Sequence, residues 1–136
     1  MAKNVLVDAS FLVALLSRRD SHHQWAVKQV PHHAPPWLTC EGVLSEAFHL
    51  LGAPGAAGLS ALLRRRALIV AFDLGSHVES GLKLLQKYAG VPMSLADACL
   101  VRMTEMLPAP VILTTDSDFR IYRRHSRQMV PLMMPF

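Results

Sequence analysis

Four acidic side chains lie beside short apolar segments of this 136-residue chain. Asp8 follows VLV, Glu46 lies within GVLSEAFHLL, Asp97 lies within SLADACL, and Asp116 follows VILTT. Carboxylates packed a few ångströms apart repel one another, and they all stay ionised only when a positive charge lies between them. Hard divalent cations prefer oxygen ligands, and the four residues include neither Cys nor His. The pattern therefore predicts a site for Mg²⁺ or Mn²⁺.

Short apolar strands alternate with helices along the chain, and these elements must position the acids. The pattern predicts strands at 4–7, 37–39, 68–72 (a buried strand), 111–115 and, at an edge, 128–132. It predicts one helix from Ser10, a second over 21–30, and a pair of helices that starts near Glu41 and is joined at 52–55. It predicts a further helix over 77–90, which Gly90 ends, and a buried helix over 94–107. This alternation indicates an α/β fold with three α/β/α layers and a mainly parallel sheet of four to five strands. Its length predicts a single domain, residues 1–136.

The predicted sheet would bring the acids together at one edge. Ligands of such folds bind at the carboxyl ends of the strands, where Asp8 and Asp116 fall. If their two strands are neighbours, both side chains project into the same crevice. Asp97 lies one turn inside its helix, and Glu46 lies at the edge of an apolar helical stripe, from which it can lean into the same crevice.

Each acid also has a structural interpretation. Asp97 stands three residues after Ser94, as in a capping box. Asp8 and Asp116 fit turns or helix caps, and Glu46 fits a solvated helix face. Four such placements in a chain with ten acidic residues favour one common site over four separate coincidences.

The charge of the chain predicts an anionic partner. Its net charge is +4, and setting the four acids aside leaves six acidic against 14 basic side chains. One basic run, Arg64 to Arg66, fits equally well a helix C-terminus or a phosphate contact. A second cluster follows the last acid, and for it we expect contact with phosphate groups through Arg120, Arg123 and Arg124.

Several classes of protein fit the sequence poorly. Charge or proline interrupts every apolar stretch before it reaches the length of a membrane span, and the N-terminus is predicted to be a strand rather than a signal peptide. Cys40 and Cys99 lack disulfide or zinc spacing, so we expect free thiols in the cytoplasm. The adjacent histidine pairs at 22–23 and 32–33 make poor chelates, and the turn after the first strand lacks the glycines of a dinucleotide site.

The segments VLVDAS, LSEAFHLL, LADACLV and LTTDSDF together resemble the four motif blocks of PIN-domain ribonucleases, especially the VapC-type toxins of VapBC toxin-antitoxin systems. They occur in the family's order and span nearly the whole chain. The resemblance implies a PIN-like fold in which the four acids bind metal. It implies supporting hydroxyls at Ser10 and Thr114 and a less constant acidic position at Asp118.

The resemblance further implies a Mg²⁺- or Mn²⁺-dependent endoribonuclease, the toxin of a toxin-antitoxin pair. An antitoxin segment would lie across the cleft and deliver an Arg to the acids, and the toxin would form a homodimer. Unpaired RNA would be recognised by shape and by stacking on aromatic residues such as Trp37 or Phe119, although both also fit a core.

Three alternatives share part of the pattern. A phosphatase of the haloacid dehalogenase type also has an Asp after its first strand, but it carries a second Asp where this chain has Ser10. An RNA-binding or partner-binding PIN-like protein without catalysis would have lost an acid, and none is lost here. A structure-specific DNA nuclease would use the same acids but generally needs additional DNA-gripping segments.

Overall fold

A five-stranded parallel sheet forms the centre of the computed structural model, which describes residues 2–136. The strand order is β3-β2-β1-β4-β7, and every neighbouring pair is parallel. The strands are β1 (Asn4–Val7), β2 (Trp37–Thr39), β3 (Leu68–Val70), β4 (Pro110–Leu113) and β7 (Leu132–Met133). The predicted α/β class, parallel sheet and strand number are confirmed.

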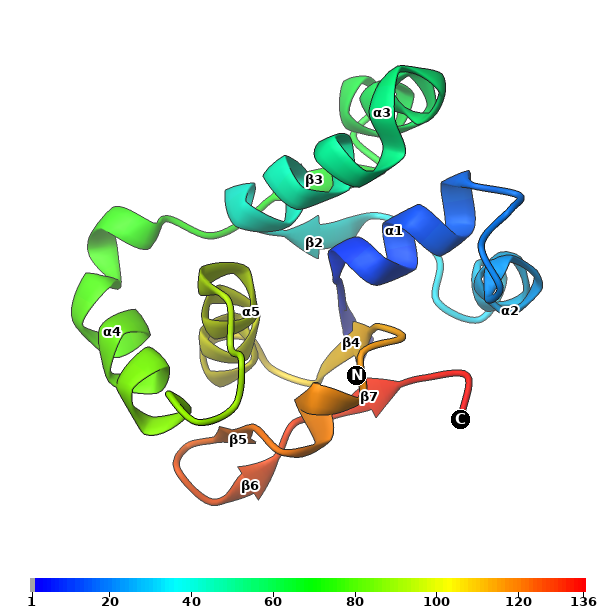
Figure 1. Ribbon diagram of the computed structural model, residues 1–136. Coiled ribbons are helices and arrows are strands. Elements are labelled where there is room, and N and C mark those ends of the chain that lie inside the picture. Colours follow the sequence, from blue (N-terminus) through cyan, green and yellow to red (C-terminus); the bar gives the residue numbers. More distant parts are fainter. Residues whose placement is uncertain (1) are drawn as a thin grey trace.

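Helices cover the sheet on both faces (Figure 1). Helices α4 and α5 pack together on one face, and α1 and α2 lie on the other, with α3 packed mainly against α1. Their bounds are α1 (Ala9–Leu16), α2 (His23–Gln29), α3 (Glu41–Arg64), α4 (Val78–Lys87) and α5 (Leu95–Met106). Two short 3₁₀ helices, η1 (Leu74–Ser76) and η2 (Ser117–Arg120), and a hairpin of β5 (Arg123–Arg124) and β6 (Gln128–Met129) complete the fold. The predicted three layers are confirmed.

Helix α3 is two helices that meet at Gly52, as the sequence predicted. Gly52 has φ 63° and ψ −168°, a backbone conformation that only glycine adopts without strain. Pro54 then lies in the first turn of the second helix, where a missing N–H does no harm. Beyond the break, Gly58 of the second helix lies against Leu16 at the end of α1.

Three predicted elements differ from the structure. The strand at 68–72 is buried only in part: Leu68 lies in the core, but β3 is at the sheet edge with one neighbour and ends at Val70, whose side chain is exposed. Helix α4 ends at Lys87, three residues before Gly90. The predicted strand at 128–132 is divided: β6 pairs with β5, and β7 continues beyond Pro131 as the edge of the main sheet.

Both aromatic residues considered for base stacking are in the core. Trp37 packs edge-on against Phe11, with 5.4 Å between ring centroids, and its indole N–H donates to the carbonyl of His33. Phe119 packs edge-on against Tyr122 at 5.3 Å and is fully buried. Neither ring has a free face, so the stacking interpretation is wrong for both residues and the core interpretation is right.

A helix that crosses a membrane must be both long and apolar. Within residues 2–136, no helix combines the necessary length with sufficient apolar character.

Candidate active site

One cavity of about 220 Å³ is lined by all four acids, together with Ser10, Leu50, Pro92 and Ser94. Strands β1 and β4 are neighbours in register, with Val7 opposite Leu113. Asp8 and Asp116 therefore leave the same edge of the sheet, where β1 turns into α1 and β4 into η2. Asp97 comes from the first turn of α5 and Glu46 from the first half of α3. We call this space the acid cavity.

Two hydroxyl groups hold Asp8, which is 5% exposed. Ser10 Oγ and Thr114 Oγ1 each donate to Asp8 Oδ2 at 2.8 Å. The same hydroxyls accept the backbone N–H groups of Thr115 and Asp116 at 3.0 Å. Each hydroxyl proton is thus used on Asp8, and the loop after β4 is tied to the start of α1. This arrangement fixes one oxygen of the Asp8 carboxylate beside the acid cavity.

Substitution of Ser10 by Ala is expected to loosen this arrangement. Asp8 would lose one hydrogen bond and the N–H of Thr115 would lose its acceptor, which should lower the free energy of unfolding by about 1–2 kcal/mol. Denaturant unfolding measures this change. Replacement of Ser17, which lies at the far end of α1, by Ala is the control and should change stability by less than about 0.5 kcal/mol. Equal effects of the two substitutions would contradict a special role of Ser10.

Asp97 is a helix cap and a lining residue of the acid cavity at once. Its backbone N–H donates to Ser94 Oγ at 3.0 Å, and its Oδ2 accepts the N–H of Ser94 at 3.1 Å, which completes a capping box. The same Oδ2 accepts the hydroxyl of Tyr122 at 3.2 Å. The capping interpretation of Asp97 is therefore confirmed, and metal binding stays a prediction for this residue, which also lines the acid cavity.

Tyr122 is a residue of this site that the sequence did not reveal. It is fully buried, and its pKa is raised by burial and by the charge of Asp97, so the phenol stays a proton donor. Its place in the sequence, beyond a short helix and 25 residues from Asp97, carries no signal that separates it from an ordinary core aromatic.

The electrostatics of the acid cavity favour a cation. Burial raises the pKa of Asp8, against the effect of its hydroxyl hydrogen bonds. Burial and the charges of Asp97 and Asp116 raise the pKa of Glu46. Burial, with the charges of Asp8 and Asp116, raises the pKa of Asp97 to about 6. A divalent cation in the cavity would reverse these shifts, because it stabilises the ionised carboxylates.

The donor set fits a hard cation, although the side chains are spread around the cavity. Among the described residues, no three His, Cys, Asp or Glu side chains are close enough together, as they stand, to ligate one ion. The oxygen-only chemistry of the set is that of a Mg²⁺ or Mn²⁺ site.

The remaining predicted site residues lie outside the acid cavity. Asp118 does not line it; its backbone N–H donates to Asp116 Oδ1 at 2.9 Å and so orients that carboxylate. Arg123 donates to the carbonyls of Arg120, Ile121 and Tyr122. Arg124 donates to the carbonyl of Thr104, and Arg120 to that of Phe136. These three arginines stabilise the chain after η2, and contact with RNA stays a prediction for them.

The comparisons with known proteins agree with this geometry. The family profile described as PIN domain matches residues 5–124. The chain belongs to the PIN-domain family. The resemblance seen in the four motif blocks is thereby confirmed. No curated protein sequence matches this PIN domain.

A solved structure shares the fold. The crystal structure of VapC20 from Mycobacterium tuberculosis, a sarcin-ricin loop cleaving toxin, superposes with a TM-score of 0.72 and 22% sequence identity. The match covers 84% of this PIN domain and 91% of that chain. At this identity the likeness establishes a common fold.

Proposed function

We propose that this PIN domain is a metal-dependent endoribonuclease and the toxin of a toxin-antitoxin pair. One observation carries the proposal: four carboxylates from four separate segments line one cavity at the carboxyl edge of the sheet. The family match, the fold shared with an RNA-cleaving toxin and the surplus of basic side chains support it. An RNA substrate of this kind would place the protein in the cytoplasm.

Asp8, Glu46, Asp97 and Asp116 would hold one or two Mg²⁺ or Mn²⁺ ions. Such an ion, when bound, supplies charge neutralisation for the attacking oxygen and for the phosphate. The protein supplies geometry: Ser10 and Thr114 fix Asp8, and Tyr122 and the capping box fix Asp97. Rigidly held carboxylates need little rearrangement during reaction, which is the main source of electrostatic catalysis.

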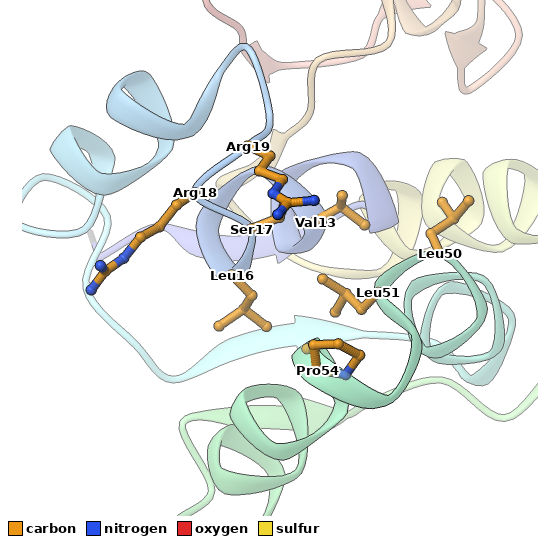
Figure 2. A pocket seen from close by; sticks show the side chains of 9 residues that line it. Val13, Leu16, Ser17, Arg18, Arg19, Leu50, Leu51 and Pro54 are labelled. Carbon is orange, nitrogen blue, oxygen red and sulfur yellow. The ribbon is translucent and has the colours of Figure 1, made fainter.

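An antitoxin partner also belongs to the proposal. A groove of about 450 Å³ lies between α1 and α3, and Figure 2 shows the apolar side chains of Val13, Leu16, Leu51 and Pro54 facing it, with Arg18 and Arg19 nearby. Leu50 lines both this groove and the acid cavity. A peptide in the groove could therefore continue over Leu50 and place a cationic side chain among the acids. A homodimer of the toxin is proposed from the family resemblance alone.

Cleavage of a mixed pool of cellular RNA by the purified protein tests the function. We expect fragments to appear with Mg²⁺ or Mn²⁺ and to be absent in EDTA, because the acid cavity needs a cation to hold a phosphate. Single-stranded DNA of mixed sequence is the matched substrate control and should stay intact. Cleavage that persists in EDTA would overturn the carboxylate-metal mechanism. Binding of RNA by folded protein without cleavage would favour a binding role, and cleavage of DNA a DNA nuclease.

A further inference from the structure

A second cavity lies on the flank of the molecule, away from the acid cavity. Helix α4, the end of α5 and the β5–β6 hairpin enclose about 210 Å³, lined by Ser80, Lys83, Leu84, Lys87, Glu105, Arg123 and Ser126. Figure 1 shows these three elements side by side at the lower left. We call this cavity the flank pocket.

The flank pocket carries an excess of positive charge. Three of its lining residues, Lys83, Lys87 and Arg123, are cations, and Glu105 is the one acid that lines it within residues 2–136. The carboxylate of Glu105 is already used. Its Oε1 accepts from Arg102 at 3.2 Å, and its Oε2 accepts the backbone N–H of His125 at 2.6 Å. The lysines therefore find no carboxylate partner in the pocket.

Neither lysine of the flank pocket forms an ion pair with another described residue. The Arg102–Glu105 pair is the only salt bridge within the part of the chain that the structure describes. A surface with surplus positive charge attracts a ligand with negative charge and many acceptors, such as a phosphodiester.

The pocket is pre-formed rather than a chance gathering of flexible side chains. Lys87 Nζ donates to the carbonyl of Ser126 at 3.0 Å, and Tyr88 accepts the N–H of Arg123 at 2.8 Å. The hairpin tip holds His125 and Ser126 at φ 47° and 69°, a left-handed conformation that costs energy for residues other than glycine. The bond from His125 to Glu105 keeps the tip in place.

The flank pocket is connected to the acid cavity through α5 and Tyr122. Asp97 and Glu105 are eight residues apart on α5, which corresponds to about 12 Å along the helix axis. Tyr122, whose hydroxyl donates to Asp97, directly precedes Arg123 of the pocket. A strand of RNA held at the acid cavity can reach the flank pocket within a few nucleotides.

We propose that the flank pocket is a second binding site, which takes a backbone phosphate of single-stranded RNA a few nucleotides from the bond at the acid cavity. The inference rests on the proposed function for the choice of RNA as the polyanion. Lys83 and Lys87 supply the charge, Arg123 closes one side, and the hydroxyls of Ser80 and Ser126 are donors for phosphate oxygens. The site contributes affinity and direction of binding without reading base sequence.

RNA binding measured at several salt concentrations tests the proposal. All variants are made in the Asp8→Asn protein and measured in EDTA, so that the RNA is not cleaved and Mg²⁺ does not compete for the phosphates. The probe is a fluorescent single-stranded RNA of mixed sequence. Lys83→Ala with Lys87→Ala should weaken binding about tenfold at low salt and reduce the slope of log K against log salt by about 0.7, the value for one lost phosphate contact on a single strand. Lys83→Arg with Lys87→Arg should keep both near the parent values.

The matched control is Arg64→Ala with Arg65→Ala, which removes the same charge. Both residues are exposed at the end of α3, and neither lines the flank pocket or the acid cavity. The control should leave the slope close to that of the parent. Equal losses in the two double variants, or an unchanged slope in the lysine variant, would overturn the proposal.

Two further results separate this inference from its alternatives. If the lysine variant loses binding to poly-L-glutamate but keeps its affinity for RNA, the pocket serves an acidic protein and the proposal fails. If the slope changes as expected while the unaltered protein cleaves no RNA, the binding site stands and the proposed nuclease function fails. Where the protein does cleave, the lysine variant should raise KM several-fold and leave kcat within about twofold.

Discussion

Replacement of Asp8 by Asn is expected to reduce RNA cleavage by about a thousand-fold or more, which corresponds to about 4 kcal/mol of lost transition-state stabilisation. The amide is neutral and is a poor ligand for a hard cation. Its oxygen can still accept the hydroxyls of Ser10 and Thr114, so the variant should fold. It should even gain stability, because burial already disfavours the ionised form of Asp8.

Cleavage of the same RNA pool under single-turnover conditions measures this loss. Asp73→Asn is the matched control: this exposed acid caps η1 and does not line the acid cavity. Its cleavage rate should stay within about twofold of the unaltered protein, as for other surface substitutions. A folded Asp8→Asn variant with full activity would remove Asp8 from the catalytic residues and leave its hydroxyl contacts as a structural feature.

Local sequence rules were sufficient for the elements that position the acids. The apolar run before Asp8 and the run before Asp116 each mark a strand, and parallel neighbours bring their carboxyl ends together. The capping box at Ser94 and Asp97 depends on residues three apart, so it was visible in the sequence. The break at Gly52 could also be predicted, because the glycines and the proline that mark it lie close together in the sequence.

Long-range contacts were beyond those rules. The bond from Thr114 to Asp8 joins residues 106 apart, and only the family resemblance pointed to a hydroxyl there. The contact of Tyr122 with Asp97 had no signal at all. The edge position of β3 depends on strand order, which an apolar run cannot encode, and this explains why the strand is less buried than predicted. Nor does a run of arginines show that Arg123 bonds to backbone carbonyls.

Replacement of Asp97 by Asn is expected to stabilise the protein and to abolish cleavage. Burial and two neighbouring acids raise the pKa of Asp97 from 3.8 to about 6, so the folded protein binds this proton more tightly than the unfolded chain does. The stability that Asp97 contributes is thus fully present below pH 3.8 and is lost as the pH rises through about 6. Asp97→Asn does not lose this stability as the pH rises. Above pH 7 its free energy of unfolding should therefore exceed that of the unaltered protein by about 1–2 kcal/mol, a value reduced to allow for solvent screening.

Urea unfolding from pH 4 to pH 8 in EDTA measures the difference, which should grow as the pH rises. The capping box should persist, because the Asn oxygen can accept the N–H of Ser94. Asp20→Asn is the control, since Asp20 accepts the N–H of His22 far from the acid cavity, and it should shift stability by less than about 0.5 kcal/mol. A variant that is less stable at every pH would show that the cap requires the charge of Asp97.

Addition of Mg²⁺ tests whether Asp97 binds a cation or only destabilises the folded protein. A cation that binds the folded protein stabilises it by mass action, by about 2.7 kcal/mol at a hundred times its Kd. The unaltered protein should therefore gain stability with Mg²⁺ and approach or overtake Asp97→Asn, which should gain little. A bound cation would reverse the cost of burying this acid. Equal stabilisation of both proteins by Mg²⁺ would show that the ion binds outside the acid cavity.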